Sequence, residues 1–229
     1  RGVAGLTAES PVATSDGSFY VIAHPATAHL GTYRMCWCRP DVSPSGCSLT
    51  DDFAAEIGPL SLVSPMSNHY RRCIRGQICS IIDLEGFGLA DGDVVHVLNF
   101  CPEPPTFTVF QADVTPPGIL VDQWPRGGLS MPAQLGGRSV SWGEEAVMNP
   151  VGIYQLCWCM GSAGHRCLYP QDFYVRLGEL EVAGPVPSQS FLAVAGHPLT
   201  LPNVAGYGLE VDHIAIVPHA HNSTGPWET

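Results

Sequence analysis

Cysteine is the residue type in this chain with the clearest capacity for chemistry, because nine cysteines fall at ordered spacings along the 229 residues. A cysteine thiolate forms disulfides, binds zinc or attacks a substrate as a nucleophile. Ordered spacings at this frequency favour a disulfide framework, which forms in oxidising compartments. Because nine is an odd number, at least one thiol lacks a partner within the chain.

Three disulfides are expected between cysteines that are close in sequence: Cys38–Cys47, Cys73–Cys79 and Cys159–Cys167. The remaining three cysteines leave two pairings open. Cys101 pairs with Cys157 and leaves Cys36 unpaired or interchain, or it pairs with Cys36 and leaves Cys157 over. We expect the first pairing, and each bridge should contribute about 2–4 kcal/mol to stability.

Zinc binding is the main alternative, with Cys157, Cys159, His165 and Cys167 as four ligands. Zinc-binding cysteines are usually two residues apart, whereas a single residue separates Cys157 from Cys159. Ser45 stands in the first half of the chain where His165 stands in the second, so this ligand set does not repeat. No base recurs beside a thiol as a catalytic cysteine requires. Disulfides are therefore favoured, and no metal, cofactor or catalytic residue is expected.

Three other short motifs are better explained by local structure than by ligand binding. Asp91-Gly92-Asp93 has acidic side chains suited to calcium, but its counterpart at 211–213 reads Val-Asp-His, which favours a turn before a strand. Gly86-x-Gly88 lacks the third glycine and the following helix of a dinucleotide site. His219 and His221 are expected in an exposed tail rather than at a metal.

An internal repeat organises the cysteines. Residues 31–38 (GTYRMCWC) recur as residues 152–159 (GIYQLCWC), 121 positions later, and another cysteine follows each copy. Further matches, offset by 120 positions, pair Asp52-Phe53 with Asp172-Phe173, residues 57–60 with 177–180, and residues 86–89 with 206–209. His221 aligns with Cys101, which explains the odd cysteine. These ordered matches indicate a tandem array with a repeat of about 120 residues.

The module boundaries depend on which half of the repeat comes first. If the Gly-Phe-Gly-Leu half precedes the Cys-Trp-Cys half, residues 66–185 are a complete module. Residues 1–65 are then the C-terminal part of one module, and residues 186–229 are the N-terminal part of another. The opposite order gives two consecutive modules, 1–105 and 106–229, divided within the proline-rich stretch 102–125. Both orders remain open, and the first is our primary prediction.

The elements that position the cysteines are expected to be short strands, because 25 glycines and 21 prolines interrupt the chain too often for long helices. Strands are expected at 93–100, at 214–217 and on both sides of a turn at Gly58-Pro59. Alternation places Tyr33, Met35 and Trp37, with their counterparts Tyr154, Leu156 and Trp158, on a core-facing side. The cysteines then point outward. The pattern predicts an all-β fold of β-sandwich modules.

Charge and composition exclude several classes of function. The net charge of −11 argues against nucleic acid or an anionic membrane as a partner, and all ten basic residues are arginine, which removes lysine-based chemistry. No apolar run reaches the length of a membrane span. The first residue is Arg1 rather than methionine, so a processed or excised product is expected. The cysteines and a glycosylation sequon at Asn222 favour a secreted, extracellular or cell-surface protein.

The repeat resembles two groups of known modules. Gly-x-Tyr-x-Leu-Cys-Trp-Cys, followed by a cysteine, Asp-Phe and Gly-x-Leu-x-Val-x-Gly-Pro, resembles repeats of very large surface proteins of dinoflagellates and related protists. Gly184-Pro185, residues 206–209 and residues 152–154 are similar to filamin-type and plexin-type immunoglobulin-like modules. The resemblance implies immunoglobulin-like β-sandwiches in elongated, extracellular proteins of structural or adhesive role.

The expected function is therefore non-enzymatic: a structural protein that forms part of a filament, surface hair or coat. Its expected partners are neighbouring copies or modules of the same protein. The two part-modules could complete each other within one chain, or between chains by strand addition into a fibre. The alternative is a module that binds glycans or another ligand. Its exposed aromatics would be Trp124, Trp142 and Trp227, because Trp37 and Trp158 are expected in the core.

Overall fold

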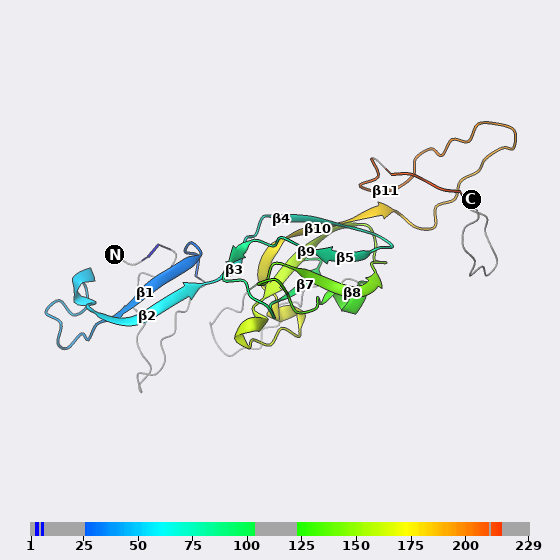
Figure 1. Cartoon of the computed structure of the whole chain (residues 1–229). Helices are drawn as coiled ribbons and strands as arrows, with labels where there is room; N and C mark the ends of the chain where they lie inside the picture. The colour runs from blue at the N-terminus through cyan, green and yellow to red at the C-terminus, as the bar shows by residue number, and fades with distance from the viewer. Residues whose placement is uncertain (1–2, 5, 7–25, 104–122, 211, 217–229) are drawn as a thin grey trace.

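The chain is all β, as its composition predicted. The computed structural model describes residues 3–4, 6, 26–103, 123–210 and 212–216. In these residues the only helical elements are single 3-10 turns: η1 (Thr50–Asp52), η2 (Pro125–Gly128), η3 (Gly161–Ala163) and η4 (Pro170–Asp172). Figure 1 shows a compact central module with a β-hairpin at one end and an extended arm at the other.

Two sheets build the central module, which we define as residues 64–185. The larger sheet contains β7 (Val94–Leu98), β9 (Gly152–Cys159), β10 (Val175–Pro185) and β4 (His69–Ile74) in that order. β9 is antiparallel to both of its neighbours, whereas β4 runs parallel to β10. The second sheet is the antiparallel pair β5 (Ile78–Ile81) and β8 (Val140–Ala146). The short strands β3 (Ser64–Pro65) and β6 (Gly86–Phe87) also pair.

One hydrophobic core lies between these sheets. Tyr154, Leu156 and Trp158 of β9 are buried on the face that alternation predicted. They pack with Val95 and Val97 of β7, with Leu180 and Val182 of β10, and with side chains of the second sheet. Trp142 of β8 is fully buried, donates its indole N–H to the carbonyl of Gly128 over 2.7 Å, and meets Trp124 edge-on. The buried area of these aromatics stabilises the contact between the sheets.

The opposite face of β9 is also buried, which corrects the expectation that its cysteines point outward. Cys157 and Cys159 lie in a second cluster with Leu98, Cys167 and Phe173. The loop between β9 and β10 folds back over this face of the sheet and brings Cys167 and Phe173 onto it. The cysteines therefore hold the β9–β10 loop against the sheet and are themselves buried from solvent.

His96 of β7 is a buried titratable residue in this second region. Its Nε2 donates to the carbonyl of Gly127 over 3.0 Å, its ring meets Phe173 edge-on, and its Nδ1 has no hydrogen-bond partner among the described residues. Burial lowers the pKa of His96, because protonation would place a charge in an apolar site. The unfolded chain thus binds a proton at a higher pH than the folded chain does, and stability is lost as the pH falls below the ordinary histidine pKa of about 6.5.

We expect His96→Gln to weaken this acid sensitivity. The melting temperature of the natural chain should fall between about pH 7.5 and about pH 5, and that of the variant should fall less. Thermal unfolding followed by circular dichroism measures both. His165→Gln, which changes an exposed histidine, is the matched control. Equal pH dependence in the natural chain and His96→Gln would contradict the assignment.

The N-terminal hairpin is formed by β1 (Gly31–Trp37) and β2 (Ala55–Leu62), and its register matches that of β9 and β10. Gly31 pairs with Leu62 as Gly152 pairs with Val182. Each hairpin has a bulge at the same place: Ile57 is skipped in β2 and Leu177 in β10. This corrects the turn expected at Gly58-Pro59, because β2 continues through both residues.

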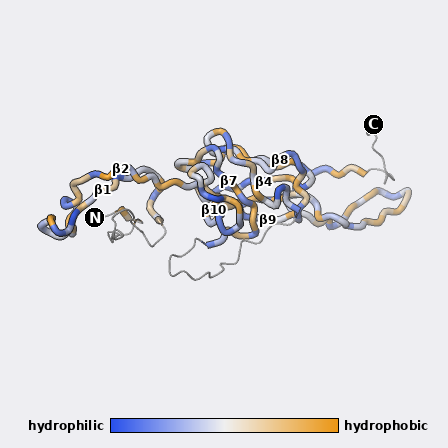
Figure 2. Tube along the Cα trace, turned by 90° about the horizontal axis from the view of Figure 1, so that it is seen from below, coloured by the Kyte–Doolittle hydropathy of each residue, from blue (hydrophilic) through white to orange (hydrophobic). Residues whose placement is uncertain are grey.

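The C-terminal arm comprises the described residues after β10, 186–210 and 212–216. Its strand, β11 (Gly206–Tyr207), pairs with the end of β10 as β6 pairs with β3, at positions 120 residues apart. The expected strand at 214–217 does not form in the described residues 212–216. Figure 2 shows hydrophobic residues along the hairpin and the arm as well as in the module, although few other described residues lie beside the hairpin or the arm.

Candidate assembly surface

Four disulfides link eight of the nine cysteines. Three are the local pairs expected from the spacing, Cys38–Cys47, Cys73–Cys79 and Cys159–Cys167. The fourth joins Cys101 to Cys157, with Cα atoms 5.6 Å apart, and ties the chain after β7 to β9. Cys36 is the free cysteine and is half-buried. This is the pairing expected when residues 66–185 are one module.

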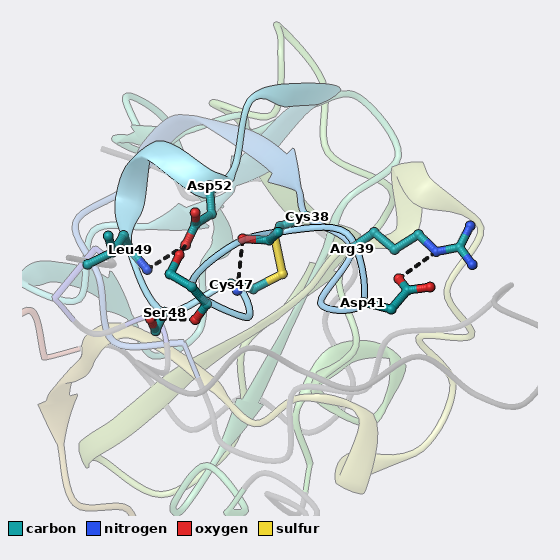
Figure 3. The surroundings of a disulfide bond; sticks show 9 residues. Cys38, Arg39, Asp41, Cys47, Ser48, Leu49 and Asp52 are labelled. Carbon is teal, nitrogen blue, oxygen red and sulfur yellow. Dashed lines mark hydrogen bonds and ion pairs between the residues drawn. A yellow bond between two sulfur atoms is a disulfide. The ribbon is translucent and has the colours of Figure 1, made fainter.

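The Cys38–Cys47 loop is held by a local polar network (Figure 3). The Asp52 carboxylate accepts hydrogen bonds from the Ser45 hydroxyl and, over 2.8 Å, from the backbone N–H of Leu49. These two hydrogen bonds lower the pKa of Asp52, with the Ser45 hydroxyl the larger cause. Asp172 accepts the same kind of backbone bond from Tyr169 over 2.9 Å in the Cys159–Cys167 loop. The two loops are therefore built alike.

The residues considered for metals have other roles in the described chain, where no group of three or more potential ligands gathers. Asp91 accepts a hydrogen bond from the backbone N–H of Gly136 over 2.7 Å. Asp93 is buried and accepts from the backbone of Ala90 and the hydroxyl of Ser162. These carboxylates anchor loops around β7. Trp227, His219, His221 and Asn222 lie outside the described residues.

The burial of three tryptophans differs from what the sequence predicted. Trp124 and Trp142, expected as exposed contacts, are core residues of the central module. Trp37, expected in the core, has 43% of its surface exposed. Its counterpart Trp158 is only 5% exposed, so the difference lies in what covers each strand and not in the strand itself.

The uncovered face of the hairpin is the main surface feature of the described chain, and an exposed apolar face is what a part-module without its other half is expected to have. Met35 and Ile57 are exposed beside Trp37, with Ile57 58% exposed. Their counterparts Leu156 and Leu177 are completely buried. In the central module this face is covered by the second sheet, formed by β5 and β8, and by Trp124. β5 belongs to the front half of the repeat, which contains the Gly-Phe-Gly-Leu motif, and β8 belongs to the back half, which contains the Cys-Trp-Cys motif. The hairpin thus presents a core-forming surface without a cover among the described residues.

The arm also exposes apolar side chains, and these are of the kind that would cover the hairpin. Phe191, Leu192, Val194, Ile214 and Ile216 are exposed, and Leu192 is 97% exposed. Counting back 120 positions, these residues correspond to positions in β4 and β7, which are the strands that flank the β9–β10 hairpin on its two sides. The arm therefore carries side chains for a front half, and the hairpin carries those for a back half.

The hairpin and the arm do not complete each other within the described chain. Figures 1 and 2 place them at opposite ends of the central module, and the strand pairs formed by the described residues include none between them. Comparisons with protein-family models, with curated proteins and with solved structures found no match. The function must therefore be argued from these two surfaces.

Proposed function

We propose that this chain is an extracellular structural protein, made of tandem immunoglobulin-like β-sandwich modules that join head to tail into a filament, surface hair or coat. Its role is structural rather than enzymatic. Its partners are copies or modules of the same protein. The observation that carries the proposal is the pair of uncovered surfaces at opposite ends of a complete, disulfide-bonded module.

The repeat is supported by equivalences in three dimensions as well as in sequence. The two hairpins share register, bulge position and a disulfide-closed loop. The strand order supports an immunoglobulin-like module: β7, β9 and β10 are adjacent in one sheet like strands C, F and G, and β5 and β8 pair like strands B and E. The bridge that joins the two sheets of antibody domains is replaced here by Cys73–Cys79 and Cys101–Cys157.

An extracellular location is supported by the disulfides. Four bridges in one chain suit an oxidising compartment, where such bonds persist. In the described part of the chain, no helix has the length and apolar character needed to cross a bilayer.

Head-to-tail assembly follows from the geometry of the ends. A contact between two different surfaces of one chain is heterologous, and unless its rotation closes a ring it continues into an open fibre. The apolar residues on both ends favour burial over exposure to water. Each added copy would cover one hairpin and present another.

Self-association of the natural chain tests this proposal. We expect the average mass in sedimentation velocity to rise above that of a single chain between about 1 and 100 μM, and elongated particles to appear in negative-stain micrographs. The driving force is burial of the hairpin and arm surfaces. A monomer at every concentration would contradict assembly by this chain.

One observation favours a glycan-binding alternative. Trp37 lies at a shallow depression with Arg39, Asp51 and Asp52, a combination of aromatic and polar groups that suits a sugar ring. The counterpart of Trp37 is a core residue, however, which favours burial against protein. Oligosaccharide binding by the monomer on a glycan array, lost in Trp37→Ala, would support the alternative.

A further inference from the structure

Both outer edges of the β1–β2 hairpin lack a paired strand in the described chain. In the central module the equivalent edges are occupied. β7 pairs antiparallel with β9, and β4 pairs parallel with β10. Unpaired edges beside an exposed apolar face are templates for strand addition.

We propose that the arm of a second copy fills both edges of the hairpin in the register that the central module uses. The segment 189–194 would pair parallel with β2, and residues 214–216 would pair antiparallel with β1. This inference rests on the proposed head-to-tail assembly and specifies its interface. The arm of the same chain lies at the far end of the central module, so the occupant is a second copy.

The pairing on the β2 side follows from β4 and β10. Leu180 is opposite Arg71 and Val182 is opposite Cys73. The equivalent positions place Leu60 of the hairpin opposite Phe191 of the arm, and Leu62 opposite Ala193. All four side chains are apolar.

The charged residues that pair between β4 and β10 are both replaced at the equivalent positions of the arm and β2. In the central module, buried Glu181 is opposite Arg72, bonds to its guanidinium over 3.1 Å and also accepts from the Tyr70 hydroxyl. The equivalent residues are Ser61, Leu192 and Ser190, so the hairpin lacks the carboxylate and the arm lacks the arginine. Docking of the arm on the hairpin would therefore leave no unpaired charge between the arm and β2. An unpaired buried charge is the main electrostatic cost of such a contact.

Gly58 supplies a second, independent observation. At the equivalent Gly178, β4 comes so close that an added Cβ would lie 2.0 Å from the carbonyl oxygen of His69. Apart from Gly58 and its two chain neighbours, no atom of the described residues lies within 4 Å of the position of a Cβ at Gly58. The hairpin thus has the space for a close backbone approach at the point where Gln189 of the arm is expected.

On the β1 side, the pairing of β7 with β9 sets the register. Val95 is opposite Trp158 and His96 is opposite Cys157. The equivalent pairs place Ala215 opposite Trp37 and Ile216 opposite Cys36. Cys36 is the free cysteine, so the natural chain already has a thiol at the interface for a cross-linking test.

Cross-linking of Ile216→Cys to Cys36 tests the register. Directly opposite residues on antiparallel strands have side chains on the same face, within disulfide reach. With oxidised glutathione as the oxidant, we expect linked dimers and larger species on non-reducing gels. Mass spectrometry should find Cys36 joined to the cysteine introduced at position 216. Ala215→Cys, one residue earlier and facing the core, should cross-link at least about tenfold more slowly, and Cys36→Ser in the Ile216→Cys chain should abolish the bond.

The outcomes separate this inference from the proposed function. A bond between Cys36 and the introduced cysteine within single chains would overturn the second copy as occupant. A second variant, His221→Cys, places a cysteine at the position equivalent to Cys101. If the chain self-associates but neither Ile216→Cys nor His221→Cys forms a bond with Cys36, the register is overturned and head-to-tail assembly still stands. A monomer without any cross-link would overturn both proposals.

Discussion

Replacement of Trp158 by alanine should lower the free energy of unfolding of the central module by about 3–5 kcal/mol, the usual cost of removing a large buried aromatic. Trp158 is 5% exposed and packs in the core between the sheets. Urea unfolding followed by circular dichroism measures the change, at a protein concentration low enough that association does not contribute. A loss of this size would remove about a fifth or more of the stability of a typical domain, which is about 5–15 kcal/mol.

Trp37→Ala is the matched variant, because Trp37 occupies the same position of the repeat and is 43% exposed. In the monomer we expect its effect on unfolding to stay within about 0.5 kcal/mol. Self-association should instead weaken by about tenfold or more, since a buried tryptophan at an interface contributes strongly to affinity. A large loss of monomer stability in Trp37→Ala, or unchanged association, would show that the hairpin face is not the assembly surface.

Removal of the Cys101–Cys157 bridge is the second prediction with a large effect. The bridge spans 56 residues, and closing a loop of this length in the unfolded chain corresponds to about 4 kcal/mol. We expect the double variant Cys101→Ala/Cys157→Ala to lose roughly this much stability in urea unfolding. Both cysteines are replaced so that the variant gains no free thiol beyond the natural one at Cys36.

The control for that variant is Cys38→Ala/Cys47→Ala. This bridge closes a nine-residue separation in the hairpin loop, outside the core of the central module. Its loss should leave the unfolding of the module nearly unchanged. If both double variants destabilised the module equally, Cys101–Cys157 would not be the bridge that holds the chain after β7 to the sheet.

Strand character and core faces could be predicted where the repeat displayed them twice. Tyr154, Leu156 and Trp158 alternate as a half-buried strand requires, and their burial is confirmed. The pairing of Cys101 could not be fixed from spacing, because Cys36 and Cys157 are equivalent in the repeat. It depends on which copy of the Cys-Trp-Cys strand lies beside β7, a contact between segments far apart in sequence.

The wrong predictions concern features that depend on contacts with other segments, which a local sequence pattern does not contain. Trp124 and Trp142 stand outside the repeated motifs, so no alternating partner showed that their strand and loop face the core. Trp37 has the local pattern of a core residue. Its burial also requires another segment to cover it, and the sequence of a strand does not indicate whether such a segment is present. Gly58-Pro59 resembles a turn in sequence, whereas both residues are paired within the continuous strand β2, directly after the bulge at Ile57.

The contact between Glu181 and Arg72 has a consequence for errors in growth. If the β4 edge of a central module were displaced by the arm of another copy, Leu192 would face Glu181, and the buried carboxylate would lose its arginine. A buried carboxylate left without its partner destabilises the state that contains it. In the proposed polymer, the same contact would therefore disfavour strand exchange in the interior, discourage branching and confine addition to the ends.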